Sequence, residues 1–172
     1  MRTRVETDAG AFVVEVDPQV APITVAHYLA HVDQRLLDGG AVYRIVTLAN
    51  QGPETRHKIE VVQWGMNRPD DRPPPLPAIV HETTRQTGLR HLDGTVSMAR
   101  AQPGTATAES FVCVGDQPEL DFGGGRNPDG LGFAAFGRVV EGMDVIRALH
   151  GRAEDDQYLA KPIRVRSVRR ER

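Results

Sequence analysis

The stretch from Asp93 to Asp116 decides how this chain folds, and it reads DGTVSMARAQPGTATAESFVCVGD. Thr95 to Met98 and Ser110 to Val114 are rich in residues that suit a pleated strand. The connection between them, Ala99 to Ala108, is rich in Ala, Gly and Thr and holds almost nothing large enough to anchor a core. A loop of this length with so little bulk is typical of a surface against which something else lies. The pattern predicts a strand, an irregular surface loop and a second strand.

The composition of the rest of the chain is that of an ordinary globular protein. The 172 residues are 40% hydrophobic and 26% charged, so we expect one domain over residues 1–172 with a core of its own. The 17 Gly and 12 Pro favour short elements joined by turns. A net charge of −2 predicts no strong attraction to nucleic acid or to anionic membranes. The single cysteine, Cys113, has apolar neighbours, which predict a buried, inert thiol rather than a nucleophile.

The chain shows no membrane or export signal. No apolar run approaches the roughly 18 residues of a membrane-spanning helix. Met1 to Arg4 leads directly into a strand-like segment without the apolar core of a signal peptide. We therefore expect a cytoplasmic location, or a periplasmic one if a signal peptide has been removed.

The first half of the chain predicts a hairpin, a helix and two further strands. The hairpin turns at residues 7–10, and the strand after it places Phe12, Val14 and Val16 on one face. The helix should begin at Pro22, continue at helical spacing to Leu36 and end at Gly39-Gly40. A polar surface loop is expected at 49–58. The expected strands are Arg2–Glu6, Ala11–Val16, Ala41–Leu48 and Ile59–Trp64.

The segment Met66–Pro77 holds five prolines and must be extended. It resembles an interdomain linker or a ligand for a proline-binding module. Strand-like residues resume at Ile79-Val80, which favours a long loop within one domain.

The second half predicts further strands and one short helix. After the two strands of the central stretch, we expect a helical turn at Gln117–Asp121 and a flexible loop at residues 123–132. A strand at Phe133–Val140 should follow, then a helix at Glu141–His150 that Gly151 ends, and a last strand at Ile163–Val168. With roughly eight strands and two helices, the fold class is mainly β.

Several short motifs are present without the context that their chemistry needs. Asp121-Phe122-Gly123 spells the metal-binding tripeptide of kinases, but no nucleotide loop or catalytic-loop pattern accompanies it. No G-x-S-x-G elbow of a serine hydrolase occurs. His27 and His31 have the spacing of helical metal ligands, yet no third ligand is apparent, so we expect them on a solvated helix face. No metal or cofactor is predicted.

Several segments in the same order along the chain resemble the cyclophilin-type peptidyl-prolyl isomerases. They are Tyr43-Arg44-Ile45-Val46, Val61-Val62-Gln63-Trp64-Gly65, Gly94 to Ala101, Phe111-Val112-Cys113 and Phe136 to Met143. The resemblance runs through nearly the whole chain. It implies a closed eight-stranded antiparallel β-barrel capped by two α-helices, with a substrate groove on its outer face.

The resemblance also implies roles for individual residues. Arg44 falls on the catalytic arginine of the family and Gln63 on the glutamine that binds the substrate backbone. Phe111 falls on the floor of the proline pocket, Leu120 on its wall, and Val61 at an edge that is usually methionine. Ala99, Arg100 and Ala101 match the segment that pairs with the peptide.

Other positions depart from the family pattern, and we keep them as candidates for substrate binding. Phe133 replaces a histidine, Glu60 an aromatic residue of the pocket and Glu109 a glutamine. Glu119 replaces a tryptophan that is associated with cyclosporin binding, so we expect cyclosporin to bind poorly. These changes predict a pocket that is less apolar and more acidic than is usual for the family.

The resemblance implies an enzyme that rotates X–Pro bonds in peptides or unfolded proteins, without a cofactor and as a monomer. The alternative is a binding module that keeps the groove without turnover. Both hypotheses predict proline-containing peptides as partners, and neither predicts nucleic acid or a membrane.

Overall fold

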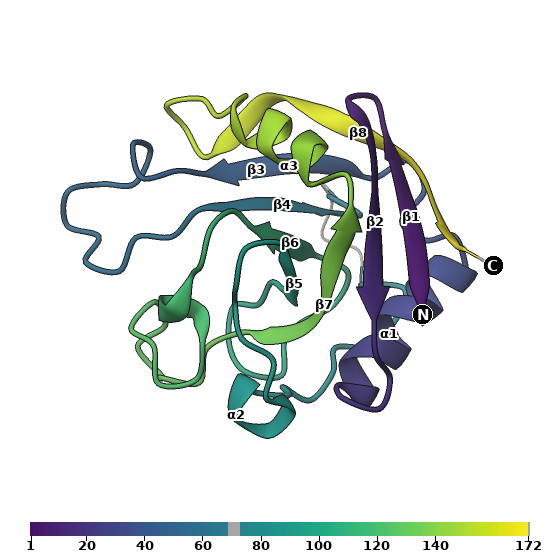
Figure 1. Ribbon diagram of the computed structural model, residues 1–172, viewed down its shortest axis with the longest axis horizontal. Helices are drawn as coiled ribbons and strands as arrows, with labels where there is room; N and C mark the ends of the chain where they lie inside the picture. The colour runs from purple at the N-terminus through teal and green to yellow at the C-terminus, as the bar shows by residue number, and fades with distance from the viewer. Residues whose placement is uncertain (69–72, 172) are drawn as a thin grey trace.

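The computed structural model describes residues 1–68 and 73–171, and its strands close into an eight-stranded antiparallel barrel (Figure 1). The strand order around the barrel is β1-β2-β7-β5-β6-β4-β3-β8, so the first and last strands of the chain pair with each other. The barrel that the resemblance implied is confirmed. The strands are β1 (Arg2–Thr7), β2 (Gly10–Val16), β3 (Ala41–Val46), β4 (Val61–Gly65), β5 (Thr95–Met98), β6 (Ser110–Cys113), β7 (Ala134–Glu141) and β8 (Tyr158–Arg170).

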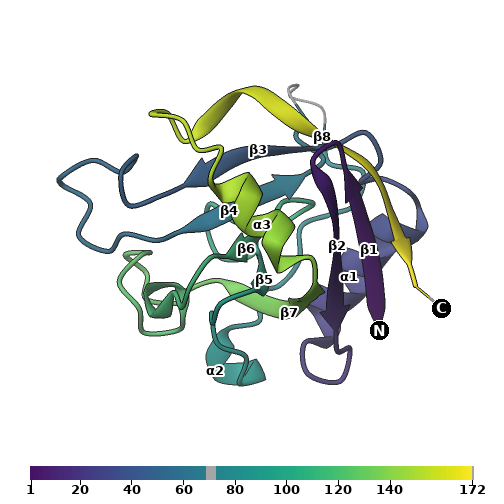
Figure 2. The same ribbon diagram turned by 45° about the horizontal axis from the view of Figure 1, so that its top comes forward.

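Helices α1 (Pro22–Asp33) and α3 (Met143–His150) cover different sides of the barrel (Figures 1 and 2). α1 contacts β7 and β8, whereas α3 contacts β2, β3 and β4. Val25, Tyr28 and Val32 of α1, like Ile146 and Leu149 of α3, are buried in the interior core. Each helix therefore contributes an apolar face to the same hydrophobic core.

The barrel has two hydrophobic clusters because successive residues of a strand point to opposite faces. Val62 and Trp64 of β4 join the interior cluster, where the Trp64 ring meets Phe12 edge-on at 5.7 Å between centroids. Val61 and the β6 residues Phe111 and Cys113 point outward and form a second, smaller cluster. This outer cluster supports the candidate site described below.

Several expected element boundaries were wrong. α1 begins at Pro22 as expected but ends at Asp33, since Arg35 has a left-handed φ of 57° that breaks the helix. Ile79-Val80 is no strand: Ile79 forms one isolated bridge with Ala106, and Val80 is 70% exposed. Phe133 lies just before β7.

One strand is longer than expected, and one helix was not expected. β8 starts at Tyr158, five residues before the expected Ile163. A third helix, α2 (Thr84–Thr87), has a capping box in which Thr83 and Gln86 satisfy each other's backbone N–H groups. The helical turn expected at 117–121 is present as η1 (Pro118–Leu120). Part of the expected extended loop at 66–77 lies outside the described residues.

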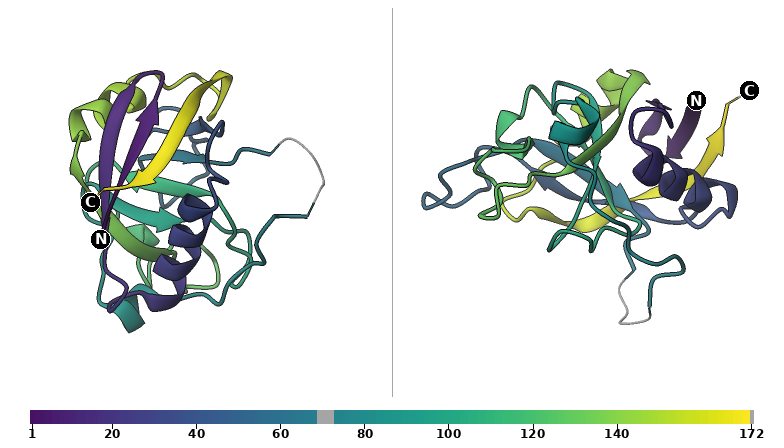
Figure 3. Two further views of the ribbon diagram at one scale, coloured as in Figure 1. Left: turned by 90° about the vertical axis from the view of Figure 1, so that its right-hand side faces the viewer. Right: turned by 90° about the horizontal axis from the view of Figure 1, so that it is seen from below.

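The expectation that His27 and His31 lie on a solvated helix face was wrong, because they are 8% and 1% exposed. The His27 Nε2 atom lies 2.6 Å from the Thr107 carbonyl oxygen, and the His31 Nδ1 atom lies 2.9 Å from the His27 carbonyl oxygen. His27 thus fastens α1 to the loop between β5 and β6, and the His31 ring packs against it. Figure 3 shows α1 beside the barrel from two further directions.

Within residues 1–68 and 73–171, no helix has both the length and the apolar character to cross a membrane. The same part of the chain has no group of three or more His, Cys, Asp or Glu side chains placed to hold a metal ion.

Candidate active site

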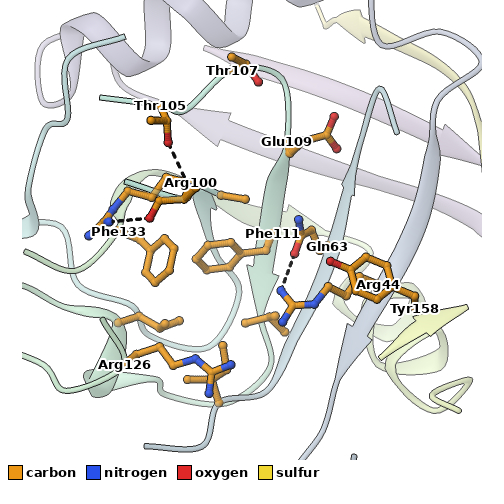
Figure 4. Close-up of a pocket in the computed structure, with 15 residues that line it drawn as sticks. Arg44, Gln63, Arg100, Thr105, Thr107, Glu109, Phe111, Arg126, Phe133 and Tyr158 are labelled. Atoms are coloured by element: carbon orange, nitrogen blue, oxygen red, sulfur yellow. Dashed lines mark hydrogen bonds between the residues drawn. The ribbon is translucent and has the colours of Figure 1, made fainter. Parts of the chain in front are cut away.

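A cavity of about 420 Å³ opens on the outer face of the barrel, over the outer hydrophobic cluster. Strands β3, β4 and β6 form its base, and the loops at 99–109 and 120–133 form its sides (Figure 4). The residues that line it are Arg44, Ile59, Val61, Gln63, Ala99, Arg100, Ala101, Thr105, Thr107, Glu109, Phe111, Leu120, Arg126, Phe133 and Tyr158.

The floor of the cavity is aromatic and rigid. The Phe111 and Phe133 rings meet edge to face, with 5.3 Å between centroids and an interplanar angle of 88°. Phe111 is 4% exposed and Leu120 is fully buried. Both side chains line the cavity and are packed in the outer hydrophobic cluster beneath it. Such a floor fits a small, rigid apolar ring.

A buried polar chain supports Phe111 from behind. The His91 ring stacks on Phe111 with 6.1 Å between centroids, and its nitrogens contact Asp121 at 2.7 Å and Ser97 at 2.9 Å. The residue types are those of a hydrolytic triad, but Ser97 is 0% exposed and meets no substrate. Burial raises the pKa of Asp121, and the hydrogen bonds from His91 outweigh it and lower that pKa overall. These contacts give His91 a structural role behind the cavity floor.

Arg44 is brought to the cavity wall by a β-bulge. The register of β3 shifts between Val42 and Arg44 against both neighbouring strands, so that Arg44 pairs with Gln63 on β4 and with Tyr158 on β8. Bulges of this kind re-aim a side chain. The Arg44 Nε and Nη2 atoms donate to the Gln157 side-chain oxygen at 3.1 and 2.6 Å, and Nη1 donates to Gln63 at 3.0 Å.

The orientation of the Gln63 amide follows from its partners. A guanidinium only donates, so the Gln63 oxygen must face Arg44 and its nitrogen must face Tyr43, to whose hydroxyl it donates at 2.8 Å. One N–H of the Gln63 amide is left over for a ligand. Burial and the nearby Glu109 carboxyl raise the pKa of Tyr43. Tyr43 therefore stays a neutral partner that fixes Gln63.

The Arg100 side chain does not reach into open space, because it is only 1% exposed. Its guanidinium forms a bidentate pair with Asp129 at 2.9 and 3.0 Å and lies over the Phe133 ring at 5.2 Å. It also donates to the Gly132 carbonyl oxygen at 2.6 Å. The charge of Arg100 is thus neutralised, and the segment Ala99–Ala101 presents mainly its backbone to the cavity.

Of the three glutamates expected to make the pocket acidic, only Glu109 lines the cavity. Its carboxyl accepts from the Asn67 N–H at 3.2 Å, and burial raises its pKa. Glu60 pairs with His150 at 3.5 Å and Glu119 with His57 at 2.8 Å, both away from the cavity. The lining holds Arg44, Arg100 and Arg126 against this one glutamate, so the expectation of an acidic pocket was wrong.

Sequence reasoning placed most of the lining but missed several residues. Gln157, just before β8, and Tyr158, its first residue, hold Arg44 from more than a hundred positions later in the chain, and no local signal marks them. Arg126 lies in a glycine-rich loop that was expected to be merely flexible. Tyr43 had a signal, since it directly precedes Arg44 in a quoted motif. Ile59, Thr105 and Thr107 complete the residues that were missed.

Comparison with known proteins agrees with this architecture. The family model described as cyclophilin type peptidyl-prolyl cis-trans isomerase/CLD matches residues 2–170. The chain is 35% identical over 147 residues to peptidyl-prolyl cis-trans isomerase cyp18 of Streptomyces antibioticus, covering 84% of this chain and 80% of that protein. It is 30% identical over 149 residues to peptidyl-prolyl cis-trans isomerase B of Escherichia coli strain K12, covering 84% and 81%.

Solved structures show the same fold. A cyclophilin-type isomerase of Cryptosporidium parvum, crystallised in the presence of the dipeptide Ala-Pro, superposes with a TM-score of 0.78 at 14% identity, covering 100% of this chain and 99% of that one. The cyclophilin AquaCyp293 of Hirschia baltica gives a TM-score of 0.71 at 19% identity, covering 97% and 72%. From the match over residues 2–170 and these relatives, the chain belongs to the cyclophilin-type peptidyl-prolyl cis-trans isomerase family.

Proposed function

We propose that this protein rotates X–Pro peptide bonds in flexible or unfolded protein chains and so assists their folding, with Arg44 as the catalytic residue. The observation that carries the proposal is a guanidinium held by neutral side-chain oxygens beside a cavity with an aromatic floor. We place the activity in one domain over residues 1–172, acting as a monomer in the cytoplasm.

The reaction needs about 5.5–7 kcal/mol of selective transition-state binding. An X–Pro bond crosses a barrier of ~20 kcal/mol because the twisted amide loses its partial double-bond character. Unassisted rotation takes ~10–100 s, so reaching ~10³ s⁻¹ requires roughly 10⁴–10⁵-fold acceleration. No covalent bond breaks, so the reaction calls for no nucleophile, metal or cofactor.

Arg44 supplies an interaction that favours the twisted amide over the planar one. As the amide twists, its nitrogen becomes pyramidal and regains a lone pair, which accepts a hydrogen bond from a guanidinium. In the planar ground state that lone pair is delocalised, so the hydrogen bond forms only near the transition state. Gln157 and Gln63 hold the Arg44 fork in advance, so little reorganisation is needed.

The remaining lining residues hold the substrate on either side of the rotating bond. Phe111, Leu120 and Val61 receive the proline ring on the apolar floor. The spare N–H of Gln63 and the backbone of Ala99–Ala101 hold the chain before the proline, so that only one end rotates. Phe133 closes the floor beside Phe111.

Replacing the guanidinium tests the proposal. We expect Arg44→Ala to lower kcat/KM by about 10²-fold or more, since one preorganised donor is worth about 2.7–4 kcal/mol in the transition state. The measurement is NMR exchange spectroscopy on a proline peptide, which follows the cis and trans forms directly. Arg138→Ala is the matched control, because Arg138 is an exposed arginine on β7 outside the cavity, and it should keep the wild-type rate.

The same spectra separate catalysis from a binding module that lacks turnover. Peptide resonances that shift on addition of the protein without exchange peaks between cis and trans forms would support the binding module. Exchange at the wild-type rate in Arg44→Ala would remove Arg44 from the mechanism while leaving the activity itself in place.

A further inference from the structure

The cavity carries more positive charge than rotation of a neutral amide requires. Arg44 and Arg126 both line it, and among the residues that the structure describes neither guanidinium has a carboxylate partner. Arg100 is neutralised by Asp129. Glu109 borders both this cavity and a neighbouring one, and its carboxyl accepts from the Asn67 N–H rather than from either guanidinium. Two unneutralised cations therefore face one space.

Arg126 is held in place by neutral acceptors that use only part of its donor set. Its Nη1 atom donates to the Gln51 side-chain oxygen at 2.9 Å and to the His57 carbonyl oxygen at 3.1 Å. A guanidinium has five N–H groups, so Nε and Nη2 keep three donors without a partner among the described residues. The Arg126 backbone is fixed as well, through its N–H on the Glu119 carbonyl oxygen at 3.1 Å.

The loop around Arg126 is packed rather than free. A Cβ on Gly125 would lie 2.5 Å from the His57 ring, so the glycine allows the loops at 49–58 and 123–132 to touch. The Gly125 N–H donates to Glu119 at 2.8 Å, and Glu119 contacts His57 at 2.8 Å. These contacts hold the loop in place, so the position of Arg126 at the cavity is fixed.

Arg44 also keeps unused donors. Nε, one N–H of Nη1 and one of Nη2 bind Gln63 and Gln157, which leaves one N–H on each terminal nitrogen. Figure 4 shows the Arg44 and Arg126 side chains reaching toward the same open space beside Phe111. Burial and the charge of Arg44 lower the pKa of Arg126, as expected for two cations that face each other.

We infer that Arg126, together with the free donors of Arg44, forms a carboxylate subsite that selects substrates with a negative charge directly after the proline. An anion there relieves the repulsion between the two guanidiniums and accepts from their spare N–H groups. The carboxylate comes from an Asp or Glu side chain, or from the chain terminus of a peptide that ends in proline. This inference rests on the proposed function.

The residues that hold each part of the peptide determine where the negative charge must lie relative to the proline. Gln63 and Ala99–Ala101 hold the chain before the proline, and Phe111 receives the ring. Figure 4 shows Arg126 across the Phe111 and Phe133 rings from Arg100. A chain held before the proline at Ala99–Ala101 would therefore continue after the proline past Arg44 toward Arg126. A charge before the proline would instead meet the loop of small residues at 99–108.

The test compares peptides that differ at one position. We compare matched Pro-Glu and Pro-Gln peptides by exchange spectroscopy. The wild-type protein should have a kcat/KM about 5–10 times higher for the Pro-Glu peptide, which corresponds to a free-energy difference of about 1–1.4 kcal/mol. The ratio should fall as the salt concentration rises. A second comparison uses a peptide that ends in proline with a free carboxylate and the same peptide with a C-terminal amide. It shows whether the subsite binds a terminal carboxylate as well as an Asp or Glu side chain.

Variants at position 126 test the assignment of the residue. Arg126→Gln should bring the Pro-Glu to Pro-Gln ratio close to one, and Arg126→Lys should keep part of the preference. Arg126→Glu should favour Pro-Lys over Pro-Glu, which is a gain that a misfolded loop cannot produce. Arg56→Gln, which removes an exposed cation from the neighbouring loop without touching the cavity, should keep the wild-type ratio.

Equal rates on Pro-Glu and Pro-Gln peptides in the wild-type protein would overturn the inference and leave the proposed isomerase intact. So would a preference that persists in Arg126→Gln, or one that follows a charge placed before the proline. Absence of exchange on every peptide would instead contradict the proposed function itself.

Discussion

At the scale of single residues, Glu109 is the side chain whose surroundings suit its charge least. Its Oε2 atom is buried without a hydrogen-bond partner among the described residues, and Oε1 accepts from the Asn67 N–H at 3.2 Å. Burial raises its pKa above the ordinary 4.5, so the folded protein binds this proton more tightly than the unfolded chain does. Its contribution to stability is therefore present below pH 4.5 and is lost as the pH rises through the folded-state pKa.

Replacing this carboxyl should stabilise the protein at neutral pH. We expect Glu109→Gln to raise the free energy of unfolding by about 1 kcal/mol at pH 7.5, because the change removes a buried charged oxygen that lacks a partner. The gain should shrink as the pH falls to 4.5, because the native carboxyl has a raised pKa and gains its proton above that pH. Urea unfolding at the two pH values measures both. A variant that is less stable than the wild type at pH 7.5 would show that the carboxylate is better satisfied than its contacts indicate.

Arg44 shows at the same scale how neutral partners preserve the charge of the guanidinium that we propose as catalytic. Had an Asp or Glu held the guanidinium, the pair would have met the substrate as a neutral unit. Gln157 and Gln63 fix the fork through amide oxygens and leave its positive charge unneutralised. Tyr158 adds an aromatic face 5.7 Å from the guanidinium carbon.

At the scale of elements, α1 is joined to the loop between β5 and β6 through the buried His27, whose ring packs against the buried His31. Burial lowers the pKa of His27 and of His31, so folding favours their neutral forms. Their contribution is fully present above the ordinary pKa of 6.5 and is lost as the pH falls below it. Thr107, which accepts from His27, also lines the cavity, so this contact borders the candidate active site.

We therefore expect these two groups to make the protein lose stability as the pH falls from 7.5 to 5.5. The double variant His27→Gln, His31→Gln should lose less over the same range, because glutamine does not titrate. Chemical unfolding at both pH values, with amide hydrogen exchange in α1, gives the comparison. An identical loss in the wild type and the double variant would assign the pH dependence to other groups.

At the scale of the whole molecule, the barrel depends on its two chain ends. β1 and β8 pair along registers from Thr3–Arg170 to Thr7–Val165, and β8 also pairs with β3. The bidentate contacts of Arg169 with Asp38 and of Arg170 with Asp33 hold the end of β8 near α1. Removing β8 opens two strand edges and exposes the interior cluster.

We expect deletion of residues 158–172 to abolish the cooperative unfolding transition that the full chain should show as a single step. The reason is that Val165 and Val168 belong to the one interior core that all strands share. Differential scanning calorimetry of both proteins tests this. A truncated chain that still melts sharply, or a full chain that melts in two steps, would contradict the proposal of one domain over residues 1–172.

Local chemistry in the sequence determined the alternation of β4 and β6, the start of α1 at Pro22, and the motifs that carry Arg44, Gln63 and Phe111. These follow from side-chain periodicity and backbone preference, which act between near neighbours. Tertiary structure alone decided the Arg44 contacts with Gln157 and Tyr158, the burial of His27 and His31, and the basic character that Arg126 gives the cavity. Closure of the barrel brings together residues far apart in the chain, so no local pattern encodes those contacts.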